Sequence, residues 1–101
     1  MIHVIASIEV KQGRVLDFIE IFKSNMPNVL QEKGCIQYVP CIDIPTKLPP
    51  QKMNSLGVTI IEKWESLEDL NAHISSPHMI AYKKKVADLV DSLSLKILTE
   101  A

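Results

Sequence analysis

The stretch that decides the fold is residues 60–78, which read IIEKWESLEDLNAHISSPH. An apolar strand ends at Trp64, and Ser66 with Asp69 stands at the spacing of a capping box, so a helix begins directly after the strand. The inward stripe expected of this helix consists of Leu67, Leu70 and Ile74. His73 lies at the edge of that stripe. The only tryptophan and a titratable imidazole are therefore expected at the mouth of one strand–helix junction, which suits the binding and deprotonation of a flat organic molecule.

Alternation of apolar and polar residues predicts four strands. They cover Ile2–Val10, Cys35–Asp43, Leu56–Trp64 and Ser92–Thr99. The residues expected to share one face within each strand are Ile2, Val4, Ala6, Ile8 and Val10, then Ile36, Tyr38 and Ile42, then Val58 and Ile60, and finally Leu93, Leu95 and Ile97. Each strand is thus expected to bury one face.

Helical spacing predicts two further helices. The first covers Val15–Glu32, ends before Gly34, and carries Pro27 on its solvent side with a kink near Met26. Its expected buried face consists of Val15, Phe18, Ile19, Phe22, Met26, Val29 and Leu30. The last helix begins at Ser76-Pro77, because serine is a favoured cap and proline fits the first helical position. Its expected buried face consists of Met79, Tyr82, Val86, Leu89 and Val90.

The predicted order is strand, helix, strand, strand, two helices, strand, with a proline-rich loop over Ile44–Asn54. This is the α+β, ferredoxin-like split βαβ arrangement, in which helices cover one face of a four-stranded antiparallel sheet. We expect residues 1–101 to form a single domain. The other sheet face carries Ile5 and Ile61, and no element remains to cover it, so a homodimer with its two sheets face to face is expected.

Charge and hydropathy exclude several classes of function. Eleven basic and twelve acidic residues give a net charge of −1, which offers no electrostatic footprint for nucleic acid. The lysines of Lys83–Lys85 point in different directions around a helix and form no stripe. No apolar run approaches the ~18 residues that cross a bilayer, and the N-terminus lacks the features of a signal peptide. Cys35 and Cys41 would lie ~20 Å apart on one strand, too far for a disulfide, so we expect buried, reduced thiols and a cytoplasmic protein.

The sequence predicts no metal and no cofactor. The three glycines form no phosphate-binding loop, which argues against a nucleotide or flavin. His73 and His78 are separated by a helix boundary, and no spacing of Cys, His or carboxylate matches a zinc or iron site. His78 is expected to be exposed, with its charged form slightly unfavourable at the start of a helix. His3 is assigned no role.

Several motifs resemble the antibiotic biosynthesis monooxygenase family. Gly34–Tyr38 resembles its Gly-Cys-x-x-Tyr segment, Glu62–Trp64 its Glu-x-Trp strand end, and Leu70–His73 with Ser76–His78 its Leu-x-x-His and Ser-Pro-His segments. The motifs occur in the family's order over nearly the whole chain. The resemblance implies a dimeric α/β barrel and, in many members, cofactor-independent oxidation of quinols or hydroxylated aromatics by dioxygen.

Another branch of the family degrades haem and is similar to this chain at Trp64 and His73. That branch also requires an asparagine in the first strand. No asparagine stands between Met1 and Lys23, and the expected place falls at or beside Ala6. The resemblance therefore favours oxidation of a small aromatic substrate over haem degradation.

The candidate site residues are assigned as follows. His73 deprotonates or hydrogen-bonds the substrate, and Trp64 supplies a stacking wall and an indole N–H. Tyr38 and Tyr82 orient phenolic oxygens, and Glu62 orients or charge-balances a neighbouring group. The alternative hypothesis is a non-catalytic dimeric module that binds a small hydrophobic ligand or a protein partner. In that case these side chains serve packing alone.

Overall fold

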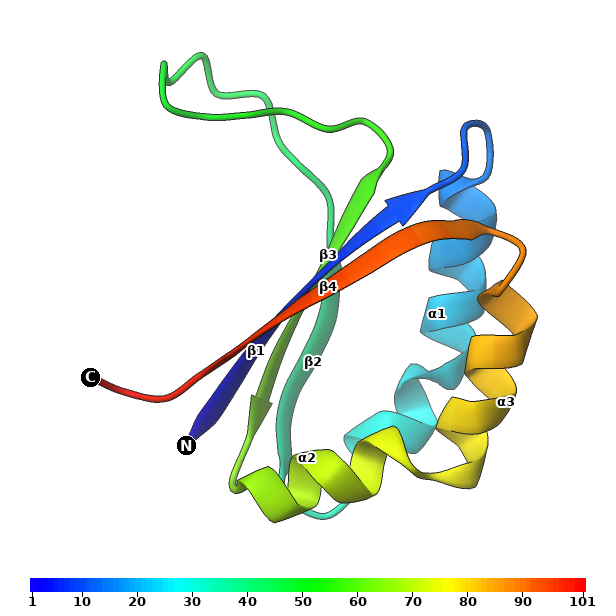
Figure 1. Ribbon diagram of the computed structural model, residues 1–101, viewed down its shortest axis with the longest axis vertical. Coiled ribbons are helices and arrows are strands. Elements are labelled where there is room, and N and C mark those ends of the chain that lie inside the picture. Colours follow the sequence, from blue (N-terminus) through cyan, green and yellow to red (C-terminus); the bar gives the residue numbers. More distant parts are fainter.

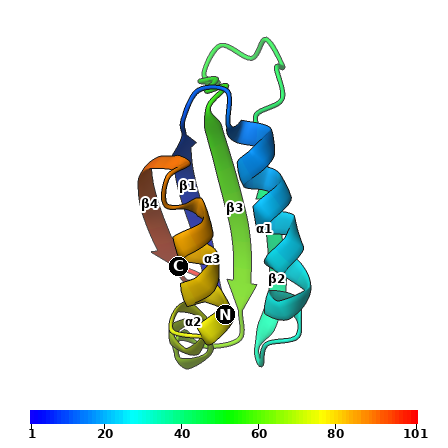
Figure 2. The ribbon, with the colours of Figure 1, turned by 90° about the vertical axis from the view of Figure 1, so that its right-hand side faces the viewer.

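The computed structural model describes residues 1–101 and has the predicted architecture. The elements are β1 (Ile2–Val10), α1 (Val15–Leu30), β2 (Cys35–Cys41), β3 (Gly57–Trp64), α2 (Leu67–Ile74), α3 (Pro77–Val86) and β4 (Val90–Leu98). The strands form one antiparallel sheet in the order β2-β3-β1-β4. All three helices lie on the same side of it (Figures 1 and 2). The α+β, ferredoxin-like prediction is confirmed. No helix has the length and apolar character needed to cross a membrane.

The core lies between the sheet and the helices and follows from the alternation of the central strands. On β1 the side chains of Val4, Ala6, Ile8 and Val10 are buried, as predicted. The neighbouring strand β3 buries Val58, Ile60, Glu62 and Trp64 on the same side. From α1, Phe18 and Phe22 complete the layer. Because Glu62 and Trp64 belong to this inner face, β3 directs a carboxylate and an indole beneath the helices.

Several apolar side chains expected inside are exposed instead. A register shift between Cys35 and Gln37 makes a bulge in β2, so Ile36 leaves the face of Tyr38 and is half exposed. β2 ends at Cys41 rather than Asp43, which leaves Ile42 in solvent. Being the edge strand on its side of the sheet, β2 also leaves Cys35 and Cys41 only half-buried, although both are free thiols as expected.

The helices show corrections of the same kind. α1 ends at Leu30 rather than Glu32, and Leu30 is exposed because Val29, about 100° away around the helix, takes the buried position. In α2 the buried residues are Leu70 and His73, so Leu67 and Ile74 flank the inward face and are exposed. The inward face of α2 therefore consists of one aliphatic residue, Leu70, and the histidine.

Two apolar surfaces of the sheet have no cover. On the face opposite the helices, Ile5 and Ile61 lie directly across from each other and are half-buried. The other surface lies on the edge strand β4, whose side chains Leu93, Leu95 and Ile97 share the inner face yet remain about half exposed. The predicted loop is present. It projects beyond one end of the sheet between β2 and β3 (Figure 1).

Candidate active site

Trp64 and His73 lie side by side at the end of the sheet where β3 leads into α2. Trp64, the last residue of β3, has an exposed fraction of 0 %, and His73 of α2 has 3 %. Their ring centroids are 4.7 Å apart with the planes tilted by 36°. Tyr38 of β2 meets the imidazole edge-on at 5.4 Å. The structure therefore brings three of the five candidate residues into one aromatic cluster.

The start of α2 fixes where the imidazole points. Ser66 caps the helix, and its Oγ accepts the backbone N–H of Asp69 at 3.1 Å. The preceding backbone is tied to the residue just before β2, because the N–H of Glu65 donates to the carbonyl of Gly34 at 2.9 Å. These bonds hold α2 across the end of the sheet, so its inward face directs His73 toward Trp64.

Glu62 is the fourth candidate residue in the cluster. Its side chain has an exposed fraction of 7 %, and its Oε1 accepts the indole N–H of Trp64 at 3.0 Å. Burial raises the pKa of the Glu62 carboxyl; the indole N–H opposes this, and the charge of Glu32 adds to it. A buried carboxyl with a raised pKa holds its proton more readily than an exposed one, which is a property of carboxyl groups that act in proton transfer.

His73 has a carboxylate partner that the sequence did not reveal. Its Nδ1 lies 2.6 Å from Oε2 of Glu32, which follows α1 and has an exposed fraction of 17 %. Burial lowers the pKa of His73, while the hydrogen bond to Glu32 counteracts it. No local pattern could have indicated this pair, because 41 residues separate its members.

The imidazole of His73 also lines a largely apolar pocket. Nε2 has no hydrogen-bond partner in the protein, and because no enclosed side-chain nitrogen or oxygen lacks a partner, Nε2 keeps access to solvent. The pocket has a volume of about 120 Å³. It is lined by Val4, Glu62, Leu70, His73, Ile74, Met79, Lys83, Leu95 and Ile97. An imidazole and a carboxyl thus share a small, largely hydrophobic hollow.

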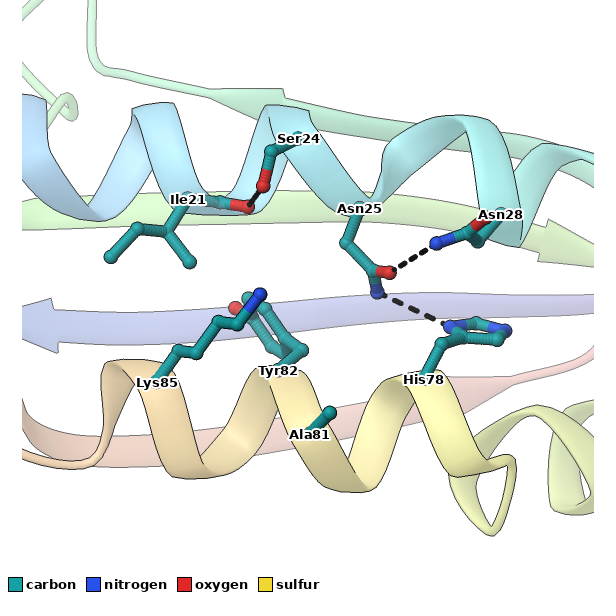
Figure 3. A pocket seen from close by; sticks show the side chains of 8 residues that line it. All are labelled: Ile21, Ser24, Asn25, Asn28, His78, Ala81, Tyr82 and Lys85. Atoms are coloured by element: carbon teal, nitrogen blue, oxygen red, sulfur yellow. Dashed lines mark hydrogen bonds between the residues drawn. The ribbon is translucent and has the colours of Figure 1, made fainter.

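The remaining candidates lie behind or beside this pocket. Trp64 and Tyr38 do not line it; they back the imidazole from inside the core. Tyr82 packs edge-on against Phe18 and Phe22 and lines a second hollow of about 160 Å³ between α1 and α3 (Figure 3). Burial raises the pKa of Tyr38 and of Tyr82, so both hydroxyls stay protonated. The structure therefore does not bring Tyr82 to the pocket of His73.

The other histidines have contrasting environments. His78 was expected to be exposed, but its side chain has an exposed fraction of 25 % and its Nε2 lies 3.1 Å from Oε1 of Glu32. His3 pairs with the exposed Glu100 near the chain ends. No group of three or more His, Cys, Asp or Glu side chains is placed to hold a metal ion.

Comparison with known proteins gives the family of the chain and supports its fold. Residues 1–85 match the sequence model of the family described as antibiotic biosynthesis monooxygenase. The chain is 37 % identical over 103 residues to the probable quinol monooxygenase YgiN of Escherichia coli K12, covering 97 % of this chain and 96 % of that protein. A conserved protein from Methanosarcina mazei Go1 has a similar structure, with a TM-score of 0.85, 26 % identity, and coverage of 99 % and 92 % of the two chains. A Nitrosomonas europaea protein assigned to the antibiotic biosynthesis monooxygenases gives a TM-score of 0.84 at 18 % identity, with coverage of 99 % and 98 %. The chain belongs to the antibiotic biosynthesis monooxygenase family.

Proposed function

We propose that this protein is a cofactor-independent monooxygenase that oxidises a quinol or a related hydroxylated aromatic with dioxygen. The observation that carries the proposal is the pocket beside His73. There the imidazole of His73 and the buried carboxyl of Glu62 line a hollow whose other walls, apart from Lys83, are apolar. The similarity to a probable quinol monooxygenase supports the same class of substrate.

The chemistry begins with the substrate anion. Dioxygen is a triplet and reacts slowly with closed-shell organic molecules, but an electron-rich anion can donate one electron to it. In the proposed reaction Nε2 of His73 takes a proton from a substrate hydroxyl, giving an imidazolium and the anion. A pocket with mostly apolar walls favours this step by excluding water that would compete for the hydroxyl.

The later steps of the proposed reaction need only dioxygen and the proton that His73 holds. Electron transfer gives a substrate radical and superoxide, and their combination forms a C–O bond and a peroxide anion. This anion takes back the proton that His73 holds and becomes a hydroperoxide. Where the carbon that carries the hydroperoxide also carries a hydrogen, loss of water from the two groups leaves a carbonyl. One oxygen atom thus enters the product and the other leaves as water.

The neighbouring residues have supporting roles in this proposal. Glu62 accepts a hydrogen bond from a second substrate hydroxyl or returns a proton during loss of water. Trp64 holds Glu62 through its indole N–H and stacks behind the imidazole, so it positions both groups. Tyr38 closes the core side of the imidazole. Tyr82 lines the separate groove between the helices and takes no direct part at this pocket.

Pocket size limits the substrate. An apolar cavity of ~150 Å³ holds benzene, so a hollow of about 120 Å³ is close to the size of one aromatic ring and no larger. A second ring would extend past Leu95 and Ile97 toward the uncovered side of β4. A single-ring hydroquinone is therefore the first compound to test.

The proposed assembly is a homodimer formed through the sheet face that the helices leave open. Ile5 and Ile61 form the apolar centre of that face, and no element of the chain covers them. Sedimentation velocity is expected to show a dimer that Ile61→Glu dissociates. Leu16→Glu, on the exposed side of α1, is the matched control and is expected to leave it intact. A monomeric wild-type protein would refute this assembly.

Oxygen uptake tests the catalytic proposal. Wild-type protein is expected to accelerate oxygen consumption by methylhydroquinone, and His73→Ala is expected to abolish the acceleration. Asn71→Ala, an exposed position on the same helix, is the matched control and should keep wild-type activity. Binding of hydroquinones and polyphenols by the wild-type protein without oxygen consumption would refute the catalytic proposal. It would favour the alternative, a module that binds a small hydrophobic ligand in the pocket, whose lining includes six apolar residues.

A further inference from the structure

We propose that Glu32 and His78 form a positioning pair that sets the tautomer of His73 and stabilises its charged form during catalysis. This inference rests on the proposed function and deepens it by naming the residues on which the base depends. Neither residue lines the pocket of His73. Both act through the imidazole and are positioning residues.

The contacts form a continuous chain from the pocket to the groove between α1 and α3. Nδ1 of His73 lies 2.6 Å from one oxygen of Glu32, and Nε2 of His78 lies 3.1 Å from the other. Nδ1 of His78 meets the side-chain amide of Asn25 at 3.3 Å, and Asn28 donates to Asn25 at 3.0 Å. Figure 3 shows Asn25 and His78 facing each other across the groove. The carboxylate is thus held from both sides.

The chain of contacts assigns the protons. A carboxylate only accepts hydrogen bonds, so Glu32 requires an N–H from each imidazole. His78 then carries its proton on Nε2, and its Nδ1 accepts the amide N–H of Asn25. His73 carries its proton on Nδ1. Nε2 of His73, which has no partner in the protein and keeps access to solvent, is therefore the unprotonated nitrogen, and it is ready to accept a proton from a substrate.

The same carboxylate offsets the cost of charging a buried base. An imidazolium enclosed by Trp64 and Tyr38 loses solvation, and this loss lowers the pKa of His73. Glu32 raises that pKa, while the charges of His78 and Lys83 on α3 lower it. From β3, the buried carboxyl of Glu62 lines the same pocket. Without Glu32, the nearby acidic group left to favour the imidazolium would be Glu62, which lies on the side of the pocket.

His78 gives the arrangement its rigidity. Its Nε2 also lies 3.2 Å from Oγ of Ser76, whose hydroxyl donates to the backbone carbonyl of His73 at 2.8 Å. Through Ser76, the turn between α2 and α3 is thereby linked to His73, the base, and to His78, which holds the carboxylate of Glu32. A single structural unit fixes the imidazole ring and its acidic partner.

The primary test is Glu32→Gln in the full-length protein, assayed by oxygen uptake with methylhydroquinone. The amide keeps the shape but loses the charge, so kcat is expected to fall at least tenfold while KM changes less than threefold. The rising limb of the pH profile of kcat/KM is expected to move to lower pH, because the group that raises the pKa of His73 is gone. Glu20→Gln, an exposed position on α1, is the matched control and should leave both unchanged.

His78 is tested with two variants. His78→Ala removes one donor to Glu32 and is expected to lower kcat at least threefold. His78→Gln places an amide nitrogen near the position of Nε2 and is expected to restore at least half of that loss. Equal loss in the two variants would show that the ring matters for packing alone and would overturn the role of His78.

Nitrogen-15 NMR of the imidazoles provides a measurement that does not depend on turnover. Wild-type His73 is expected as the Nδ1–H tautomer above pH 7, and Glu32→Gln is expected to convert a measurable fraction to the Nε2–H form. An Nε2–H tautomer in the wild-type protein, or unchanged kcat in Glu32→Gln, would overturn this inference while leaving the proposed function standing. Absence of oxygen uptake by the wild-type protein would instead overturn the proposed function, and the catalytic role of Glu32 with it.

Discussion

Two glycines with nearly the same backbone conformation provide a sharp test of how the site is held. Gly13 has φ +79° and Gly34 has φ +80°. Alanine at either position meets a strain of roughly 1–2 kcal/mol, partly offset by roughly 0.4–1 kcal/mol from the reduced freedom of the unfolded chain. A Cβ at Gly13 meets no atom within 4 Å. Gly13→Ala should therefore cost about 1 kcal/mol of unfolding free energy.

Gly34→Ala should cost more because of the side chain of Asp69. An added Cβ would lie 2.1 Å from Oδ2, 2.5 Å from Cγ and 2.7 Å from Cβ of Asp69. Rotation about χ1 can move the first two atoms away but not the third, so the first turn of α2 must shift. Overpacking of this kind costs roughly 1–3 kcal/mol, which brings the expected total to about 2–4 kcal/mol.

Urea unfolding at a fixed protein concentration measures both costs, and the midpoint of thermal unfolding should differ between the variants by roughly 4–8 °C per kcal/mol. Asp69→Ala removes Oδ2 and Cγ but keeps its Cβ, so in that background the cost of Gly34→Ala should shrink without vanishing. Because α2 carries His73, Gly34→Ala should also lower oxygen uptake, whereas Gly13→Ala should not. Equal costs for the two alanine variants would refute the reasoning.

Buried ionisable groups give three further predictions. Burial raises the pKa of Glu62, so the folded protein binds more protons than the unfolded protein between about pH 4.5 and the raised pKa, and the ionised carboxyl destabilises the fold above that range. Glu62→Gln should therefore stabilise the protein relative to wild type at pH 8, and equilibrium unfolding should show this gain disappearing toward pH 4. Burial raises the pKa of the Cys35 thiol from 9.0 to about 11, so at pH 8 its alkylation by iodoacetamide, followed by peptide mass spectrometry, should be roughly a hundredfold slower than that of a solvent-exposed cysteine. Tyr38 and Tyr82 have raised pKa values, and ultraviolet titration should show that neither ionises at pH 11 unless the protein unfolds.

The fold could be predicted where side-chain periodicity and burial agree. β1 and β3 alternate over their full length, and the structure pairs them in register from Ile2 with Trp64 to Glu9 with Gly57. The prediction was wrong at Ile36, because a bulge depends on how a strand meets its neighbour and leaves no mark in the strand's own pattern. It was also wrong at Leu67, which is about half exposed, because Leu70 and the polar His73 form the inward face of the helix.

The candidate site could be predicted only where it is local in sequence. Trp64 and His73 are nine residues apart, so the strand end, the cap and the helix period were enough to place them near each other. The partner of His73 lies in the turn after α1, and only the packing of α1 against β2 and α3 brings Glu32 to it. The pocket likewise needs Leu95 and Ile97 from the other end of the chain. Sequence spacing carries no information about such contacts.

His78 shows why a local electrostatic argument failed. Considered within its own helix, an imidazole in the first turn meets an unfavourable dipole worth roughly 0.3–1 kcal/mol when it is charged, and exposure to water is the natural expectation. A hydrogen bond to a carboxylate is worth roughly 1.5–3 kcal/mol, so one tertiary contact with Glu32 outweighs the dipole. Because the same carboxylate also meets His73, the two histidines of the motif are coupled through a residue outside it. A chain that kept the motif but replaced Glu32 by a neutral residue would therefore retain the fold and lose the feature that orients the base.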